Sequence, residues 1–216
     1  MKKLLAAVLG ILLLGSCAVK FVGQEFPEVV KVVTPFGHGS GVVVEQGVLT
    51  AEHVVSFLVQ GGREYKIETA NGTFEGNTYS LRGGRGRIDW AILNVETGIK
   101  PARVYCGPLQ LGEPVVHVGY PQISGTVSKY ITWGRVNSVD TGGEGAYANM
   151  VGLDIGADAG SSGGPVYNRR GEVIGTVIAV GRGHYGSMWT TLMARPPAEV
   201  CPPKPDPLPV ISNEVP

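Results

Sequence analysis

The sequence predicts an all-β fold, a sandwich or a barrel, and three observations support this prediction. About ten short runs rich in β-branched and aromatic residues follow one another, with Gly, Asn or Pro between them. The chain contains 33 glycines and 15 prolines, which favour tight turns and disfavour long helices. The one convincing helical stretch, residues 51–59, is short. A βαβ sheet, which needs helices between its strands, is therefore disfavoured.

The β-rich runs fall into two groups. A turn-rich segment at residues 98–114 separates these groups, and its sequence is GIKPARVYCGPLQLGEP. After residue 194 the composition changes to PPAEVCPPKPDPLPV, so we expect residues 196–216 to form a Pro-rich, polyproline-like tail. The runs are VVKVV, GVVVEQGVLT, REYKIETA, GTFEGNTY and WAILNV in the first group, and PVVHVGY, KYITWGRVNSV, MVGLDI, GEVIGTVIAV and MWTTLMA in the second.

Composition narrows the class of protein. Hydrophobic residues make up 43% and charged residues 17% of the chain, which is an ordinary globular balance. The formal net charge is zero and the arginines are scattered, so we expect no nucleic-acid partner. No two histidines lie at the spacing of zinc ligands, and neither a metal nor another cofactor is predicted.

The N-terminal sequence is typical of an export signal. Lys2 and Lys3 precede an apolar run from Leu4 to Leu14, which is short for a membrane span and right for a signal peptide over residues 1–16. The run ends in LGSC, which resembles the lipobox of bacterial lipoproteins. That resemblance implies lipidation of Cys17, a membrane anchor and a tether over residues 17–28. Ordinary signal cleavage, with Cys17 incidental, is the alternative, and both readings imply export.

Two further cysteines, Cys106 and Cys201, follow the signal region. Export would place them in an oxidising compartment, where a disulfide can form. They are too far apart in the sequence for a zinc-ligand pattern, and spacing leaves their pairing open. If Cys17 is lipidated, Ala18 at the next position favours the periplasmic side of the outer membrane over full secretion.

Residues 158–166, DAGSSGGPV, place two serines in a glycine-rich loop. Such a loop can be an ordinary turn, and a serine becomes a strong nucleophile only when a base takes its proton. His53 lies in LTAEHVV, at a junction between a strand and a helix, where an imidazole can be fixed at the edge of a cleft. Asp89 heads the hydrophobic run WAILNV, where it can either close a turn or accept the Nδ1 proton of a histidine.

The order of these residues discriminates among serine-nucleophile architectures. GSSGG matches the elbow pattern of α/β-hydrolases, but those enzymes need an acid and then a histidine after the serine. Only His184 and then Asp206 follow Ser162, so that order fails. A subtilisin-like order needs an aspartate before the histidine, and none precedes His53. The remaining order, His53, Asp89, Ser162, is that of chymotrypsin.

Three motifs resemble those of trypsin-like serine proteases: LTAEHVV, IDWAIL and GSSGGPV. Four more, GSGVVV, GYP, ITWGRVNSV and GEVIGTVIAV, resemble the bacterial HtrA/Deg protease domain. The resemblance covers residues 29–195 and implies two antiparallel β-barrels, over about 29–98 and 113–195, with the active site in the cleft between them. No PDZ domain is expected after the barrels, and the oligomeric state is left open.

The resemblance also implies the role of each site residue. Ser162, directly before two glycines, would be the nucleophile, His53 the general base and Asp89 its orienting acid. The oxyanion hole would be formed by the amides of Gly160 and Ser162. Ser161 replaces the aspartate that pairs with a new N-terminal amine in digestive members, so no activation of that kind is expected.

The same resemblance implies a specificity pocket. Gly156 would lie at its base, while Ile178 and Val180 would narrow its wall. The sequence thus predicts an exported serine endopeptidase that acts on polypeptide substrates. An inactive binding domain on the same fold and an esterase with the same residues are the alternatives, and a zinc hydrolase is disfavoured.

Overall fold

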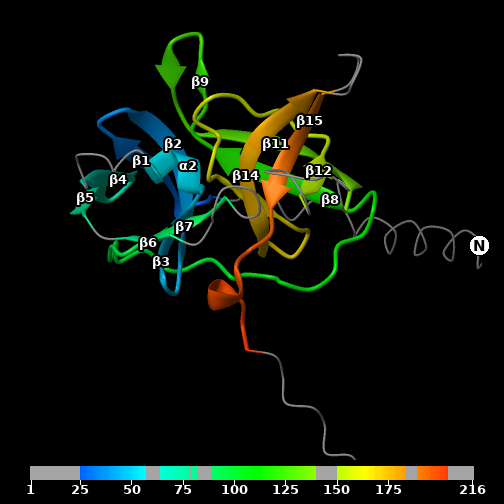
Figure 1. Ribbon diagram of the computed structural model, residues 1–216, viewed down its shortest axis with the longest axis horizontal. Helices are drawn as coiled ribbons and strands as arrows, with labels where there is room; N and C mark the ends of the chain where they lie inside the picture. The colour runs from blue at the N-terminus through cyan, green and yellow to red at the C-terminus, as the bar shows by residue number, and fades with distance from the viewer. Residues whose placement is uncertain are drawn as a thin grey trace, which may run out of the picture.

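The computed structural model of the chain describes residues 25–56, 64–77, 79–81, 89–139, 150–182 and 189–203. The predicted signal peptide, Cys17, His184 and Asp206 lie outside these ranges. Figure 1 shows two β-rich halves side by side, with the N-terminal half on the left and the C-terminal half on the right. The all-β prediction is confirmed.

The N-terminal half is a seven-stranded antiparallel sheet with the order β5-β4-β1-β2-β3-β7-β6. In the described part of the chain this sheet does not close on itself, whereas a closed barrel was expected. Its strands are β1 (Val29–Thr34), β2 (Gly37–Val44), β3 (Gly47–Thr50), β4 (Tyr65–Thr69), β5 (Gly72–Gly76), β6 (Tyr79–Leu81) and β7 (Ala91–Leu93). A short helix, α2 (Glu52–Val55), follows β3 and occupies the start of the helical stretch expected over residues 51–59.

The C-terminal half is a closed six-stranded barrel with the order β11-β12-β15-β14-β13-β8. Closure leaves no unpaired strand edge in this barrel. Its strands are β8 (Pro114–Gly119), β11 (Tyr130–Ser138), β12 (Val151–Leu153), β13 (Pro165–Tyr167), β14 (Val173–Arg182) and β15 (Trp189–Ala194). A separate two-stranded hairpin, β9 (Gln122–Ile123) and β10 (Thr126–Val127), projects at the top of the view in Figure 1.

Alternating side chains give each half its own interior, and a third cluster joins the halves. Val30, Val32 and Leu93 belong to the interior of the sheet, and Val115 and Val136 belong to that of the barrel. The joining cluster takes buried residues from both halves, namely Phe26, Val29, Val42, Val44, Leu49, Trp90 and Ile92 from the N-terminal half, and Val116, Val118, Tyr167 and Val173 from the barrel. Burying apolar surface contributes about 25 cal/mol per Å² to stability. The apolar surface buried in this cluster therefore holds the two halves together.

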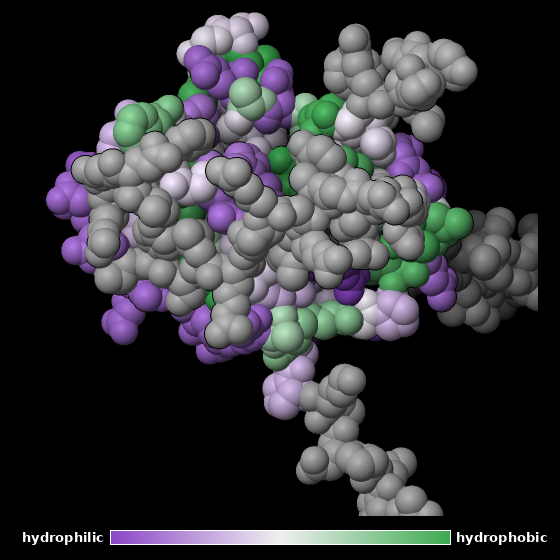
Figure 2. Space-filling view, in the orientation of Figure 1, coloured by the Kyte–Doolittle hydropathy of each residue, from purple (hydrophilic) through white to green (hydrophobic). Residues whose placement is uncertain are grey.

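Hydrophilic and apolar side chains are distributed unevenly over the visible face. Figure 2 shows hydrophilic residues around the sheet on the left and an apolar area at the right-hand edge, near β8. The large apolar side chains that are most exposed are Phe36, Leu111 and Trp133. Among the described residues, no helix is long and apolar enough to cross a membrane.

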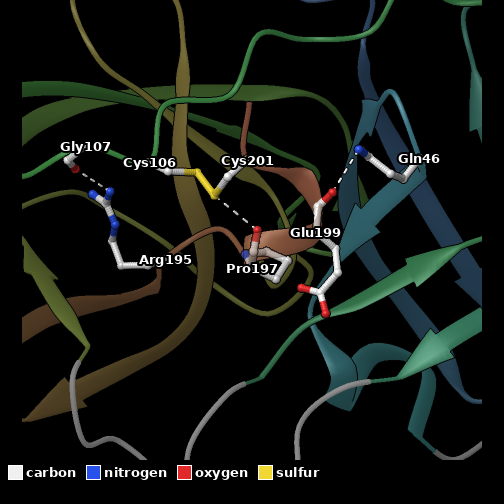
Figure 3. The surroundings of a disulfide bond; sticks show 7 residues. All are labelled: Gln46, Cys106, Gly107, Arg195, Pro197, Glu199 and Cys201. Carbon is white, nitrogen blue, oxygen red and sulfur yellow. Dashed lines mark hydrogen bonds between the residues drawn. A yellow bond between two sulfur atoms is a disulfide. The ribbon is translucent and has the colours of Figure 1, made fainter. Parts of the chain in front are cut away.

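A disulfide ties the C-terminal segment to the segment between the halves. Cys106 and Cys201 are bonded, with their Cα atoms 5.8 Å apart (Figure 3). Nearby, the guanidinium of Arg195 donates to the carbonyl of Gly107, and the side-chain amide of Gln46 donates to the carbonyl of Glu199. Residues Ala198–Val200 form a 3₁₀ turn, and Val200 packs into the cluster that joins the halves. The described start of the Pro-rich tail is thus anchored to the body of the protein, whereas an extended chain was expected.

Candidate active site

His53 is positioned by the junction between β3 and α2. Thr50 and Ala51 are fully buried at this junction, and the helix begins directly after them. The amide of Val54 donates to the carbonyl of Ala51, which closes the first turn. The His53 side chain is 46% exposed, so it is held at its base and faces solvent at its tip.

Asp89 approaches His53 from the start of β7. The adjacent Trp90 is buried in the cluster that joins the halves and fixes this end of the strand. One oxygen of Asp89 lies 2.6 Å from Nδ1 of His53, and the other accepts the backbone N–H of His53 at 3.0 Å. Because an ionised carboxylate can only accept, Nδ1 carries the proton and Nε2 is left as the basic nitrogen.

Glu52 adds a second carboxylate beside this pair. Burial raises the pKa of Glu52, and the negative charge of Asp89 raises it further. The His53 charge acts in the opposite direction, and its effect is smaller. Glu52 and Asp89 thus place two carboxyl groups beside the imidazole of His53.

The two adjacent serines of the glycine-rich loop have different surroundings. Ser161 is 2% exposed, and its hydroxyl accepts the backbone N–H of Asp158 at 3.2 Å. Its amide donates to the carbonyl of Asp158 at 2.8 Å, which closes a tight turn. Ser162 is more exposed than Ser161. Ser161 is thus used inside the loop, whereas the side chain of Ser162 reaches the surface.

Two glycines bring the loop against the junction that holds His53. Gly163 has φ +83°, and a Cβ on it would lie 2.2 Å from the Thr50 hydroxyl and 2.8 Å from the amide of Ala51. A Cβ on Gly39 would lie 2.6 Å from a methyl of Val54 and 2.9 Å from the carbonyl oxygen of Ser162. Only glycine permits approaches this close. The structure thus brings His53, Asp89 and Ser162 to one place between the halves.

Ser40 of β2 is the main link between the sheet and the loop. This residue is fully buried, and its amide donates to the carbonyl of Ser162 at 2.7 Å. Its hydroxyl donates to the carbonyl of Gly160 at 2.7 Å and accepts the amide of Tyr120 at 2.8 Å. Ser40 lies in GSGVVV, a motif that resembles the HtrA/Deg domain, but its role depends on contacts that the motif does not reveal.

The carbonyls of the loop are turned inward. Ala159 accepts the amide of Gln122 at 2.8 Å, and Ser161 accepts the amide of Gly164 at 2.9 Å. In a planar trans peptide the N–H points opposite to the preceding carbonyl. The amides of Gly160 and Ser162 therefore point away from these partners, and neither has a hydrogen-bond acceptor among the described residues. Both amides can therefore donate to a bound group, as the donors of an oxyanion hole must.

His38 supports the same corner of the loop. Its Nε2 lies 3.0 Å from the carbonyl of Tyr120, so Nε2 carries the proton that is donated. Gly160 has φ +93°, and a Cβ on it would lie 2.4 Å from that carbonyl and 2.5 Å from His38 Nε2. The role of His38 depends on a contact across 82 residues of sequence, which no local pattern reveals.

A cavity of about 580 Å³ lies beside the loop. Gly156 and Val180, both expected in the specificity pocket, are among its lining residues. Ile178, also expected there, is 5% exposed and packs instead with Ala51, Met150, Leu192 and Ala194. The other lining residues are Ile155, Ala157, Asp158, Ala159 and Thr191. Across the described ranges, no group of three or more metal-binding side chains is found.

A closed barrel beside an antiparallel sheet, with a histidine–aspartate pair from one half and a serine loop from the other, defines the trypsin-like fold class. A profile of the trypsin-like peptidase domain matches residues 39–175, and the chain belongs to this family. It is 32% identical over 152 residues to a probable periplasmic serine endoprotease DegP-like of Bartonella henselae. It is 33% identical over 136 residues to the serine protease Do-like HtrB of Bacillus subtilis.

These matches cover 68% and 59% of this chain, respectively, and 28% of each relative, so the chain spans little more than a quarter of their length. Among solved structures, the active form of the Rv3671c protease from M. tuberculosis has a TM-score of 0.61 at 23% identity, covering 80% of this chain and 78% of that one. Deg5 has a TM-score of 0.59 at 25% identity, covering 73% and 81%. The Rv3671c likeness, below 25% identity, is a likeness of fold.

The bonds of Ser40 lead to the first prediction. Ser40→Ala should keep the fold but leave the Gly160 carbonyl and the Tyr120 amide without their partner, at a cost of about 1–3 kcal/mol of stability. The loop should shift, and labelling by a fluorophosphonate, a probe of activated serines, should slow by about 10–100-fold. Thr34→Ala, at an exposed turn, is the control. Unchanged labelling of Ser40→Ala would show that the hydroxyl does not set the loop geometry.

Proposed function

We propose that the chain is an exported serine endopeptidase in which Ser162, His53 and Asp89 form the catalytic triad. The observation that carries this proposal is the double hydrogen bond between Asp89 and His53, directly beside the loop that presents Ser162. The membership of the trypsin-like peptidase family and the names of the relatives support the same reaction.

In this mechanism the Ser162 hydroxyl attacks the carbonyl carbon of a peptide bond, and Nε2 of His53 takes its proton. Asp89 holds the imidazole by Nδ1 and stabilises the positive charge that forms. The amides of Gly160 and Ser162 donate to the oxyanion of the tetrahedral intermediate. His53 then returns the proton to the leaving amine, which leaves an acyl-enzyme on Ser162. Water, activated by His53, hydrolyses this ester and restores the free serine.

An inactive binding domain is the main alternative, because fold alone does not imply activity. The basic Nε2 of His53 and the inward carbonyls of the loop favour catalysis, since a binding domain has no need of either. An esterase would use the same residues, and it would be distinguished by activity on esters without activity on peptides.

Nucleophile identity is the second prediction. Ser162→Ala should lower fluorophosphonate labelling and peptide hydrolysis by about 10⁴-fold or more, because the attacking oxygen is removed. Ser161→Ala is the matched control, and it should keep most of the activity because that hydroxyl is not the attacking oxygen and the Ser161 amide still closes the turn on Asp158. Labelling measured by gel fluorescence, with hydrolysis of a casein substrate, separates the two. A dead Ser161→Ala variant beside an active Ser162→Ala variant would overturn the assignment.

We further propose that the cavity beside the loop is the pocket for the side chain that precedes the cleaved bond. Its base carries Gly156, and Ile155, Ala157 and Val180 give it apolar walls. The Thr191 hydroxyl already donates to the carbonyl of Ile155 at 2.8 Å, so it is satisfied. Asp158 is the carboxylate on the lining, and it is exposed, with one oxygen bonded to the amide of Ala159.

Substrate preference is the third prediction. A library of peptides should be cut after Val, Ala or Leu, because a basic side chain would lose hydration in an apolar pocket. One methylene is worth about 1–3 kcal/mol, so the preference should be graded. Gly156→Asp should shift cleavage toward Lys and Arg, since its Cβ would meet only a methyl of Thr132 at 3.8 Å. Dominant cleavage after Lys or Arg by the wild type, abolished in Asp158→Asn, would contradict the apolar assignment.

A membrane anchor on Cys17 is the fourth prediction and rests on the LGSC sequence. Relatives named as periplasmic support export. Expressed in a bacterium with an alkyne-tagged palmitate, the wild type should carry the label and sediment with membranes. Cys17→Ala should lose the label, and Cys106→Ala, at a cysteine engaged in the disulfide, should keep it. An unlabelled wild type in the soluble fraction would contradict the anchor.

A further inference from the structure

A second histidine, His117 of β8, lies beneath the nucleophile loop and takes no part in the mechanism above. It is 2% exposed and lies on the same side of its strand as Val115, which belongs to the interior of the barrel. Its register partners on the two neighbouring strands are Thr132 of β11 and Val166 of β13. An ionisable side chain thus occupies an apolar interior, where charge is costly.

The imidazole is tied to the loop at two points. Nδ1 lies 3.0 Å from the carbonyl oxygen of Pro165, so the proton is on Nδ1 and is donated to that oxygen. A Cβ on Gly164 would lie 2.6 Å from Cε1 of the ring. His117 therefore packs against the backbone two and three residues after Ser162.

The other nitrogen of the ring, Nε2, has no hydrogen-bond partner among the described residues. Nε2 and the hydroxyl of Ser40 lie 3.0 and 3.1 Å, respectively, from the point where a Cβ on Gly119 would sit. That hydroxyl already donates to Gly160 and accepts from Tyr120. A second N–H on the ring, at Nε2, would therefore be buried without an acceptor in the part of the chain that the structure describes.

Among the described residues, no charged group compensates a proton on His117. The described groups placed near the ring are its strand neighbours Thr132 and Val166, the backbone of Gly164 and Pro165, and the Ser40 hydroxyl beside Gly119, and none of these side chains ionises. The nearby His38 is engaged with Tyr120, and Asp89 is engaged with His53. Burial lowers the pKa of His117 to about 4, although its bond to the Pro165 carbonyl acts in the opposite direction.

We propose that His117 is a positioning residue for the nucleophile loop that works only as the neutral imidazole, so that its protonation in acid releases the loop and stops catalysis. The inference rests on the proposed peptidase function. His53 and His117 then act in different ways, because a proton on His53 removes the base and a proton on His117 disturbs the scaffold. Activity should fall with the square of the proton concentration once both rings titrate.

The protonation of His117 also makes the stability of the fold depend on pH. The pKa in the folded chain, about 4, lies below the ordinary value of 6.5, so the unfolded chain takes up the proton first. The contribution of His117 to stability is therefore complete above pH 6.5 and is lost as the pH falls toward 4.

The test compares the full-length protein with His117→Gln and His117→Val, neither of which can titrate. Glutamine can still donate to Pro165, so its labelling rate at pH 8 should stay within about threefold of the wild type. Valine lacks that bond and should label more slowly. Val115→Ala, a cavity variant on the same face of the same strand, is the control for lost packing.

Labelling rates between pH 8 and pH 4 are the first readout. The wild type and Val115→Ala should show a slope of one in log rate below the pKa of His53, steepening toward two near pH 4. Both His117 variants should keep a slope of one. Urea unfolding at the same pH values should show a smaller acid loss of stability in the His117 variants than in the wild type.

Nitrogen-15 NMR of the ring gives a readout that needs no activity. The ring signals of the wild type that are missing in His117→Gln belong to His117. At pH 7 these signals should show a protonated Nδ1 and an unprotonated Nε2. A slope of one in the wild type, or a slope of two that persists in both His117 variants, would overturn the inference and leave the peptidase proposal intact. Absence of labelling at every pH would overturn both.

Discussion

The site depends on one contact between the two halves, referred to below as the crossing. There β2 of the sheet hydrogen-bonds the loop of residues 158–166 in the C-terminal half, which contains Ser162. In the proposed mechanism the base and its carboxylate come from the N-terminal half, while the nucleophile and the oxyanion amides come from the C-terminal half. The amide and hydroxyl of Ser40 join these parts by bonds of 2.7 Å to Ser162 and Gly160. Because catalysis tolerates little displacement of reacting groups, the geometry of this crossing sets the reactivity of the whole site.

Glycines make the crossing possible. The loop carries two residues with positive φ, Gly160 and Gly163, and each backs onto atoms that would collide with any side chain. Because these glycines have no Cβ, the backbone of the loop can lie directly against the backbone of the sheet. The joining cluster, which includes Trp90 and Val116, buries apolar surface and so keeps the two halves in contact.

Much of this arrangement could be predicted from local patterns. Residue order and motif selected His53, Asp89 and Ser162, and alternating apolar residues indicated most strands. Three features could not be predicted from local sequence patterns. The β9–β10 hairpin and β13 are too short and too rich in turn residues to read as strands. Ile178 was expected beside Val180 in the pocket wall, but a register shift between Val177 and Ala179 interrupts the alternation at that point. The contacts of Ser40 and His38 span 80 to 120 residues, so no window of sequence contains them.

The chain also shows how surroundings assign different tasks to one side chain. His53 is half exposed and bonds a carboxylate through Nδ1, as the proposed general base requires. His117 is enclosed, which keeps it neutral, and it donates to a backbone carbonyl as a structural donor. The LTAEHVV motif singled out His53 in the sequence, whereas the surroundings of His117 are visible only in three dimensions.

The most direct measurement of the central claim is a crystal structure of the protein with a peptide boronic acid, which mimics the tetrahedral intermediate. We expect a bond from boron to Oγ of Ser162, with one boronate oxygen accepting the amides of Gly160 and Ser162. His53 should remain bonded to Asp89, and Ser40 should still donate to Gly160. A bond to Ser161, or an Ala159 carbonyl turned into the oxyanion position, would contradict the account.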